Sequence, residues 1–153
     1  MKPKSYRKKA ARQPAVRRYQ LALARQAALL VDELRAELPH LLAVAVVDVA
    51  SGASLAAHAA AAGGLDLTLA TRFQLGLVRC KHQALVALQL PREQLEDILI
   101  TLSSQLHLLR LTGTGRQLIS LVVDARTTNL GLARDILRSR VARLEAEPPL
   151  PAT

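Results

Sequence analysis

Aromatic residues and cysteine are scarce in this chain of 153 residues. Its aromatic side chains are those of Tyr6, Tyr19 and Phe73, and its single cysteine is Cys80. Half of the residues are nonetheless hydrophobic, so Leu, Val, Ile and Ala must fill the core, and disorder along the whole chain is excluded. One cysteine forms neither an intramolecular disulfide nor a zinc site of several thiolates, which is typical of the reducing cytoplasm. At this length we expect one domain with one core.

Acidic residues are missing from the first 25 residues, where basic residues are abundant. The basic side chains of this segment are Lys2, Lys4, Arg7, Lys8, Lys9, Arg12, Arg17, Arg18 and Arg25. The remainder carries both signs in equal number, so the net charge of +9 comes from this segment. We predict a basic, disordered arm over residues 1–18, one domain over 19–147 and a disordered Pro-rich tail over 148–153. The arm either binds nucleic acid, anionic lipid or an acidic partner, or stays solvated.

Long hydrophobic runs are also missing. Gln20, Arg25 and Asp32 interrupt the apolar stretch that follows the basic segment, so it does not resemble a secretory signal peptide. The longest uncharged run, Val49 to Leu65, contains serine, histidine and glycine, and we expect no transmembrane helix. The Arg-rich, acid-free start leaves a mitochondrial presequence as the alternative to a cytoplasmic protein.

Hydrophobic periodicity predicts three helices and five strands. In chain order, the predicted elements span residues 19–38, 41–47, 53–57, 67–88, 95–102, 105–111, 117–123 and 130–144. The connections between the last three strands are too short for parallel crossovers, so these strands should form an antiparallel meander. We therefore expect an α+β fold of order α-β-β-α-β-β-β-α. In it, a five-stranded antiparallel sheet carries the long central helix on one face, together with N- and C-terminal helices.

The central predicted helix has two apolar stripes on opposite sides. At about 100° per residue, the stripe predicted to face the sheet contains Leu69, Phe73, Leu77, Cys80, Ala84, Ala87 and Leu88. The second stripe contains Leu67, Leu75, Val78, His82, Leu85 and Val86. One sheet covers only one stripe, so we predict that a second copy of the chain, related by a two-fold axis, covers the other. The alternative cover is the first or last helix of the same chain.

Catalytic and metal-binding residues form no recognisable constellation. Cys80 lies in a basic stretch, but its helical phase predicts a buried, unreactive thiol. Asp48 and Asp124 each end a predicted strand, where two carboxylates could meet for acid–base chemistry, although aspartate there more often forms turns. No histidine has metal ligands at suitable spacing, and the glycine-rich Thr112–Arg116 lacks the lysine of a phosphate-binding loop. We therefore expect no enzyme activity, no cofactor and no metal.

Two parts of the sequence resemble the Roadblock family, relatives of dynein light chains. They are the hairpin Val46–Ala53, and Leu121–Asp124 followed by Asn129–Arg134, which reads Asn-Leu-Gly-Leu-Ala-Arg. The resemblance covers about residues 23–145. It implies a homodimer whose central helices lie side by side and whose third strands join the two sheets into one. Bacterial members of this family resemble regulators that bind Ras-like small GTPases across the dimer without supplying a catalytic side chain.

The resemblance also implies a partner-binding platform on the central helix. Its residues are Arg72, Arg79 and Gln83 at the exposed edge, with the dimer-forming Leu75, Val78, His82 and Leu85. The expected function is a non-catalytic homodimeric regulator or scaffold for a small GTPase. The alternative is a dimeric module whose basic arm contacts nucleic acid or anionic membrane.

Overall fold

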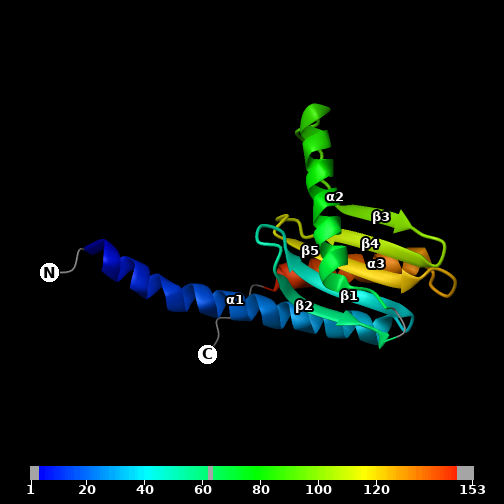
Figure 1. The fold of residues 1–153 in the computed structure, drawn as a ribbon, viewed down its shortest axis with the longest axis horizontal. Coiled ribbons are helices and arrows are strands. Elements are labelled where there is room, and N and C mark those ends of the chain that lie inside the picture. The colour runs from blue at the N-terminus through cyan, green and yellow to red at the C-terminus, as the bar shows by residue number, and fades with distance from the viewer. Residues whose placement is uncertain (1–3, 62–63, 148–153) are drawn as a thin grey trace.

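The computed structural model describes residues 4–61 and 64–147 (Figure 1). Its elements are α1 (Lys4–Glu37), β1 (Leu41–Asp48), β2 (Ser54–Ala59), α2 (Leu67–Ala87), β3 (Asp97–Thr101), β4 (Gln105–Leu111), β5 (Gln117–Asp124) and α3 (Leu130–Ala146). The strands form one antiparallel sheet in the order β2-β1-β5-β4-β3. Helices α1 and α3 cover one face, and α2 crosses the other. The predicted α+β fold and element order are confirmed.

The larger core lies between the sheet and the helices α1 and α3. Alternate strand residues point into it, among them Val44 and Val46 of β1 and Leu121 of β5, because successive side chains of a strand point to opposite faces. Leu34 of α1 and Leu137 of α3 meet them from the helices, and both are at most 1% exposed. β1 is buried along nearly its whole length, as its unbroken apolar sequence predicted.

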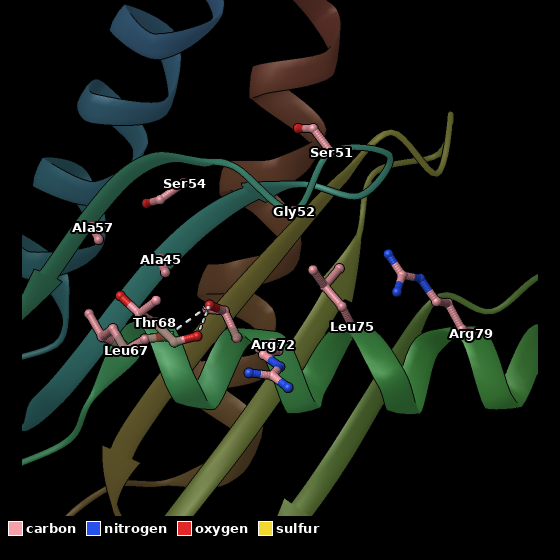
Figure 2. Close-up of a pocket in the computed structure, with 11 residues that line it drawn as sticks. Ala45, Ser51, Gly52, Ser54, Ala57, Leu67, Thr68, Arg72, Leu75 and Arg79 are labelled. Carbon is pink, nitrogen blue, oxygen red and sulfur yellow. Dashed lines mark hydrogen bonds between the residues drawn. The ribbon is translucent and has the colours of Figure 1, made fainter.

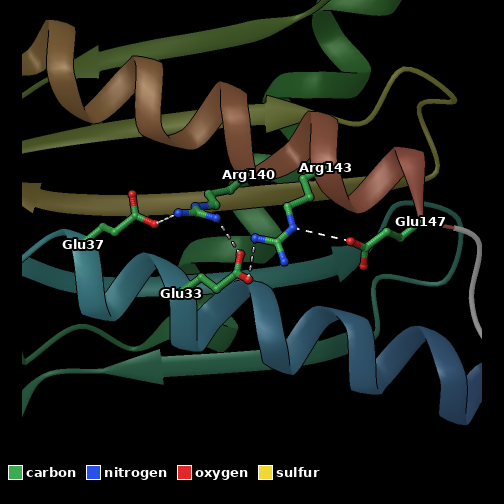
Figure 3. Close-up of polar contacts among 5 residues, drawn as sticks. All are labelled: Glu33, Glu37, Arg140, Arg143 and Glu147. Carbon is green, nitrogen blue, oxygen red and sulfur yellow. Dashed lines mark hydrogen bonds and ion pairs between the residues drawn. The ribbon is translucent and has the colours of Figure 1, made fainter.

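Ion pairs between α1 and α3 close this core at its outer side (Figure 3). Arg140 of α3 pairs with Glu33 at 3.4 Å and with Glu37, both on α1. Arg143 pairs with Glu33 and with Glu147, each at 3.4 Å. These contacts fix the two helices relative to each other on one face of the sheet.

Helix α1 begins at Lys4 rather than at Tyr19, so the arm predicted to be disordered is helical from Lys4 onward. The segment is rich in Arg, Lys and Ala, which favour helix, and the helix continues through Pro14. Residues 14–21 are all exposed, and burial begins at Ala22, so the first part of α1 projects from the domain (Figure 1). Lys2 and the predicted tail 148–153 lie outside the described residues.

Helix α2 begins at a capped end and crosses the second face of the sheet. The side chain of Asp66 accepts a hydrogen bond from the backbone N–H of Leu69 at 3.0 Å, which satisfies one free donor of the first turn. Leu75 and Val78 then pack against residues of β1 and its neighbours. Residues 79–83 are all exposed, because the end of α2 projects past the edge strand β3 (Figure 1).

A candidate protein-interaction surface

Helix α2 turns toward the sheet the stripe that was predicted to face a second copy. Leu75 and Val78 are 5% and 1% exposed and belong to the core of their own protomer. Leu67 and Leu85 are half-buried. The exposed members of the predicted dimer interface are His82 and Val86. The structure therefore places Leu75 and Val78 in the protomer core, whereas the prediction put them between two copies of the chain.

The stripe that was predicted to pack on the sheet is instead open to solvent. Phe73 is 68% exposed and Leu77 is 44% exposed, although both are large apolar side chains. Cys80, predicted to be buried beside them, is exposed as well. We call this surface the outer stripe; its residues are Leu69, Phe73, Leu77, Cys80, Ala84, Ala87 and Leu88. Neither α1 nor α3 covers α2 in this structure, because both lie on the opposite face of the sheet (Figure 1).

The sheet beneath α2, rather than the helix itself, decides which stripe is buried. The sheet presents the small side chains of Ala45 and Val47 there, and Leu75 and Val78 pack on them. The inner side also accommodates Thr71, whose hydroxyl donates to the carbonyl of Leu67 at 2.8 Å. Both stripes of the helix are apolar, so periodicity indicates two faces without indicating which one meets the sheet.

The edge strand β3 is a second uncovered apolar surface. β3 pairs with β4 on one side and ends the sheet on the other. Leu99 is 46% exposed and Leu102, just after the strand, is 47% exposed. The projecting end of α2 passes this same edge (Figure 1). An open strand edge beside exposed apolar side chains is typical of a surface that another chain covers.

The polar residues predicted to bind a partner lie on the side of α2 that borders the β1–β2 turn. Arg72, Arg79 and Gln83 are all exposed. Arg72 and Arg79 line a groove between α2 and the β1–β2 hairpin, and Leu75 lies between them and reaches toward Gly52 of the turn (Figure 2). The outer stripe and this polar rim are thus neighbouring surfaces of one helix.

The Asn-Leu-Gly-Leu-Ala-Arg segment fixes α3 against the sheet. The side chain of Asn129 accepts the backbone N–H of Leu132 at 3.0 Å and so caps the helix. Ala133 is fully buried. Arg134 donates two hydrogen bonds to the carboxylate of Asp97 on β3, at 2.9 and 3.0 Å. This segment therefore ties α3 to the open edge strand.

The two strand-end aspartates do not form a pair. β1 and β5 are antiparallel, so Asp48 lies opposite Gln117 and Asp124 lies at the other end of the sheet. Hydrogen bonds from Ser51 lower the pKa of Asp48, and those from Arg126 lower the pKa of Asp124. Each carboxylate therefore accepts hydrogen bonds within its own turn, and the interpretation of the two as an acid–base pair is wrong.

The described residues also offer no metal site of the usual kind. Over 4–61 and 64–147, no three side chains of His, Cys, Asp or Glu gather closely enough to hold an ion. In the same ranges, no helix combines the length and the hydrophobicity that crossing a bilayer requires.

The basic residues predicted to form an arm lie on the projecting part of α1. Arg17 and Arg18 are exposed there. The others in the described helix are Lys4, Arg7, Lys8, Lys9 and Arg12. The sequence pattern located this charge correctly, although it missed that the segment is helical.

Solved structures show which known fold this is, although no protein-family model and no curated protein matches the sequence. MglB of Myxococcus xanthus is 15% identical, with a TM-score of 0.64 over 83% of this chain and 87% of that chain. A Roadblock/LC7 domain from Streptomyces avermitilis is 16% identical, with a TM-score of 0.62 over 77% and 93%. A structure described as MglB with tetrameric arrangement is 17% identical, with a TM-score of 0.67 over 82% and 88%. The chain therefore has the Roadblock/LC7 fold.

Proposed function

We propose that the protein is a non-catalytic, cytoplasmic homodimer that binds a Ras-like small GTPase and modulates its hydrolysis or positioning. The observation that carries this proposal is the outer stripe of α2, which leaves Phe73 and Leu77 exposed on a well-formed helix. Contiguous exposed apolar surface promotes association, so this stripe favours a protein that binds another chain over one that stays monomeric. The resemblance of the Asn129–Arg134 segment to the Roadblock family supports the same proposal.

A two-fold dimer would cover both uncovered surfaces at once. If the open edges of two β3 strands meet, the projecting ends of the two α2 helices, which pass this edge, come together as well. An isologous contact of this kind uses every interface residue twice. Full burial of a Phe or Leu side chain contributes about 1.5–3 kcal/mol, so Phe73 and Leu77 alone would favour association substantially.

The dimer would then present two copies of the polar rim to a partner. The residues of this rim are not part of the outer stripe, so contact through that stripe does not require them. They are the exposed Arg72, Arg79 and Gln83. A surface of this kind positions a GTPase rather than performing chemistry, which agrees with the separation of Asp48 from Asp124. One of the similar MglB structures is described as a tetrameric arrangement, and that protein therefore assembles beyond a single chain.

The test mixes the full chain with Ras-like GTPases of the same cell and measures both GTP hydrolysis and co-elution. We expect the native protein to change the hydrolysis rate or to co-elute with one GTPase, and Phe73→Glu with Leu77→Glu to lose the effect. A matched control, Leu29→Glu with Leu132→Glu, alters two exposed leucines on α1 and α3 and should keep the effect. A folded dimer without either effect on every candidate would sink the proposal.

The projecting part of α1 favours a second candidate function, a dimeric module that binds nucleic acid or anionic membrane. Arg17 and Arg18 are exposed on a helix that leaves the domain, where they would reach a large polyanion. Deletion of residues 1–18 removes this charge and spares Ala22, at which burial begins after the exposed residues 14–21. If this candidate holds, the deletion abolishes binding to duplex DNA or to phosphatidylserine vesicles, and the native affinity falls steeply with salt.

A further inference from the structure

The groove between α2 and the β1–β2 hairpin has the size and lining of a binding site. Its volume is about 430 Å³, which lies in the range of ligand sites. The floor is apolar and is formed by Ala45, Ala57, Leu67 and Leu75. Figure 2 shows that Ala45 and Ala57 come from the hairpin strands, and Leu67 and Leu75 from α2. The residues that line the groove are distinct from those of the outer stripe.

The charge of this groove has one sign. Arg72 and Arg79 line it, and no carboxylate does. Neither arginine pairs with an acidic side chain among residues 4–61 and 64–147, in contrast to Arg134, which donates twice to Asp97. The hairpin and the first turn of α2 add hydroxyl groups, from Ser54 and Thr68. The rim therefore offers hydrogen-bond donors and positive charge to an anionic occupant.

We propose that this groove binds an extended acidic segment of a protein partner, with carboxylates at Arg72 and Arg79 and apolar side chains on the floor. The inference rests on the proposed function, because it takes the partner to be a protein. Seven residues of helix separate the two arginines by about 10 Å, the length of about three residues of extended chain. The apolar floor favours a peptide over a free phosphate, which would leave the exposed Ala57 and the half-buried Leu67 uncovered.

The test uses a fluorescein-labelled ten-residue peptide of aspartate, leucine and glycine, and measures its anisotropy with the full chain. A second peptide carries asparagine in place of aspartate and should not bind. Arg72→Ala with Arg79→Ala should weaken binding about tenfold, because it removes two exposed ion pairs, each of which changes affinity by up to about fivefold. Arg17→Ala with Arg18→Ala removes the same charge from α1 and should stay within twofold of the native protein. Ala57→Leu, which fills the floor without changing charge, should also weaken binding.

Three results would overturn the inference. They are the absence of binding, an equal loss in the variant of Arg17 and Arg18, and displacement of the peptide by inorganic phosphate at the same concentration as by unlabelled peptide. Circular dichroism and solution mass of each variant establish that it is folded and unchanged in assembly. Because the probe is a peptide, co-elution with a GTPase that survives without peptide binding contradicts the groove alone, and leaves the proposed function standing.

Discussion

The two faces of the sheet differ in how completely the chain covers them. On the face of α1 and α3, Leu34 and Leu137 are fully buried and the ion pairs of Arg140 close the contact. On the other face, α2 buries Leu75 and Val78 but leaves Phe73 among the most exposed large apolar side chains. The first face thus holds the larger core of the protomer. The second face leaves apolar surface exposed, and the proposed dimer would bury it.

The largest expected effect is the difference in the free energy of unfolding between substitutions on the two faces. Leu137→Ala should lower the free energy of unfolding by about 2–5 kcal/mol, because it leaves a cavity in the finished core. Phe73→Ala, measured in a Leu77→Glu background that removes association, should change it by about 0.5 kcal/mol at most. Urea denaturation measures both. A large loss for Phe73→Ala in that background would mean that this side chain belongs to the protomer core.

Cys80 gives a direct measure of whether the outer stripe is covered in solution. The thiol is exposed in the protomer and is the single cysteine of the chain, so a maleimide reports on one position. We expect native protein to react about tenfold more slowly than the Phe73→Glu, Leu77→Glu variant. In a dimer that covers the stripe, the thiol reacts only after the interface opens, and a tenfold slower reaction corresponds to an opening free energy of about 1.4 kcal/mol. Equal rates in the two proteins would indicate that the stripe stays open.

A smaller effect tests the contact that holds the open edge strand. Arg134→Ala should cost about 1 kcal/mol of stability, because it removes two hydrogen bonds to the partly buried carboxylate of Asp97. Arg138→Ala, an exposed arginine on the same helix, should cost little. A double-mutant cycle with Asp97→Asn isolates the pair. A coupling energy near zero would remove Arg134 from the contacts that position β3.

The smallest expected effect concerns how stability depends on pH through His107, a buried residue on the α2 face of the sheet. Burial lowers the pKa of His107, so the folded state favours the neutral ring. Its contribution to stability is complete above the ordinary value of 6.5 and falls as the pH drops through 6.5 toward the lower folded-state pKa. His107→Asn should therefore lose less stability than native protein between pH 7.5 and 5.5 in denaturant titrations. An unchanged slope, matching that of the exposed control His40→Asn, would contradict this.

The sequence predicted the elements well where the signal is local. β4 lies at the predicted residues, and β1 differs by one residue at its end, because short apolar runs between turns leave few other choices. The start of α1 was missed, since charge was taken to favour disorder although lysine and arginine also favour helix. The carboxylate pair failed for a topological reason, because antiparallel strands place Asp48 and Asp124 at opposite ends.

The sequence indicated the two apolar stripes of α2 but not which of them the sheet buries. Two stripes on α2 were evident from periodicity, and the need for a second cover follows from them. Phe73 was assigned to the core because it shares a helical sector with Leu69 and Leu77, whereas Leu75 and Val78 pack on the sheet at Ala45 and Val47 instead. These two residues belong to β1, which is distant in sequence, so no pattern within α2 reveals them. Arg72 and Arg79 were predicted as partner residues by resemblance, and the groove that they line appears only in the fold.

The central claim is that the outer stripe of α2 joins two copies of the chain. Light scattering of the full chain measures this most directly, with one protomer at 16.5 kDa. We predict twice that mass for the native protein and for the Leu29→Glu, Leu132→Glu control, and the mass of one folded chain for Phe73→Glu with Leu77→Glu. A native monomer, or a variant that keeps the doubled mass, would contradict the account.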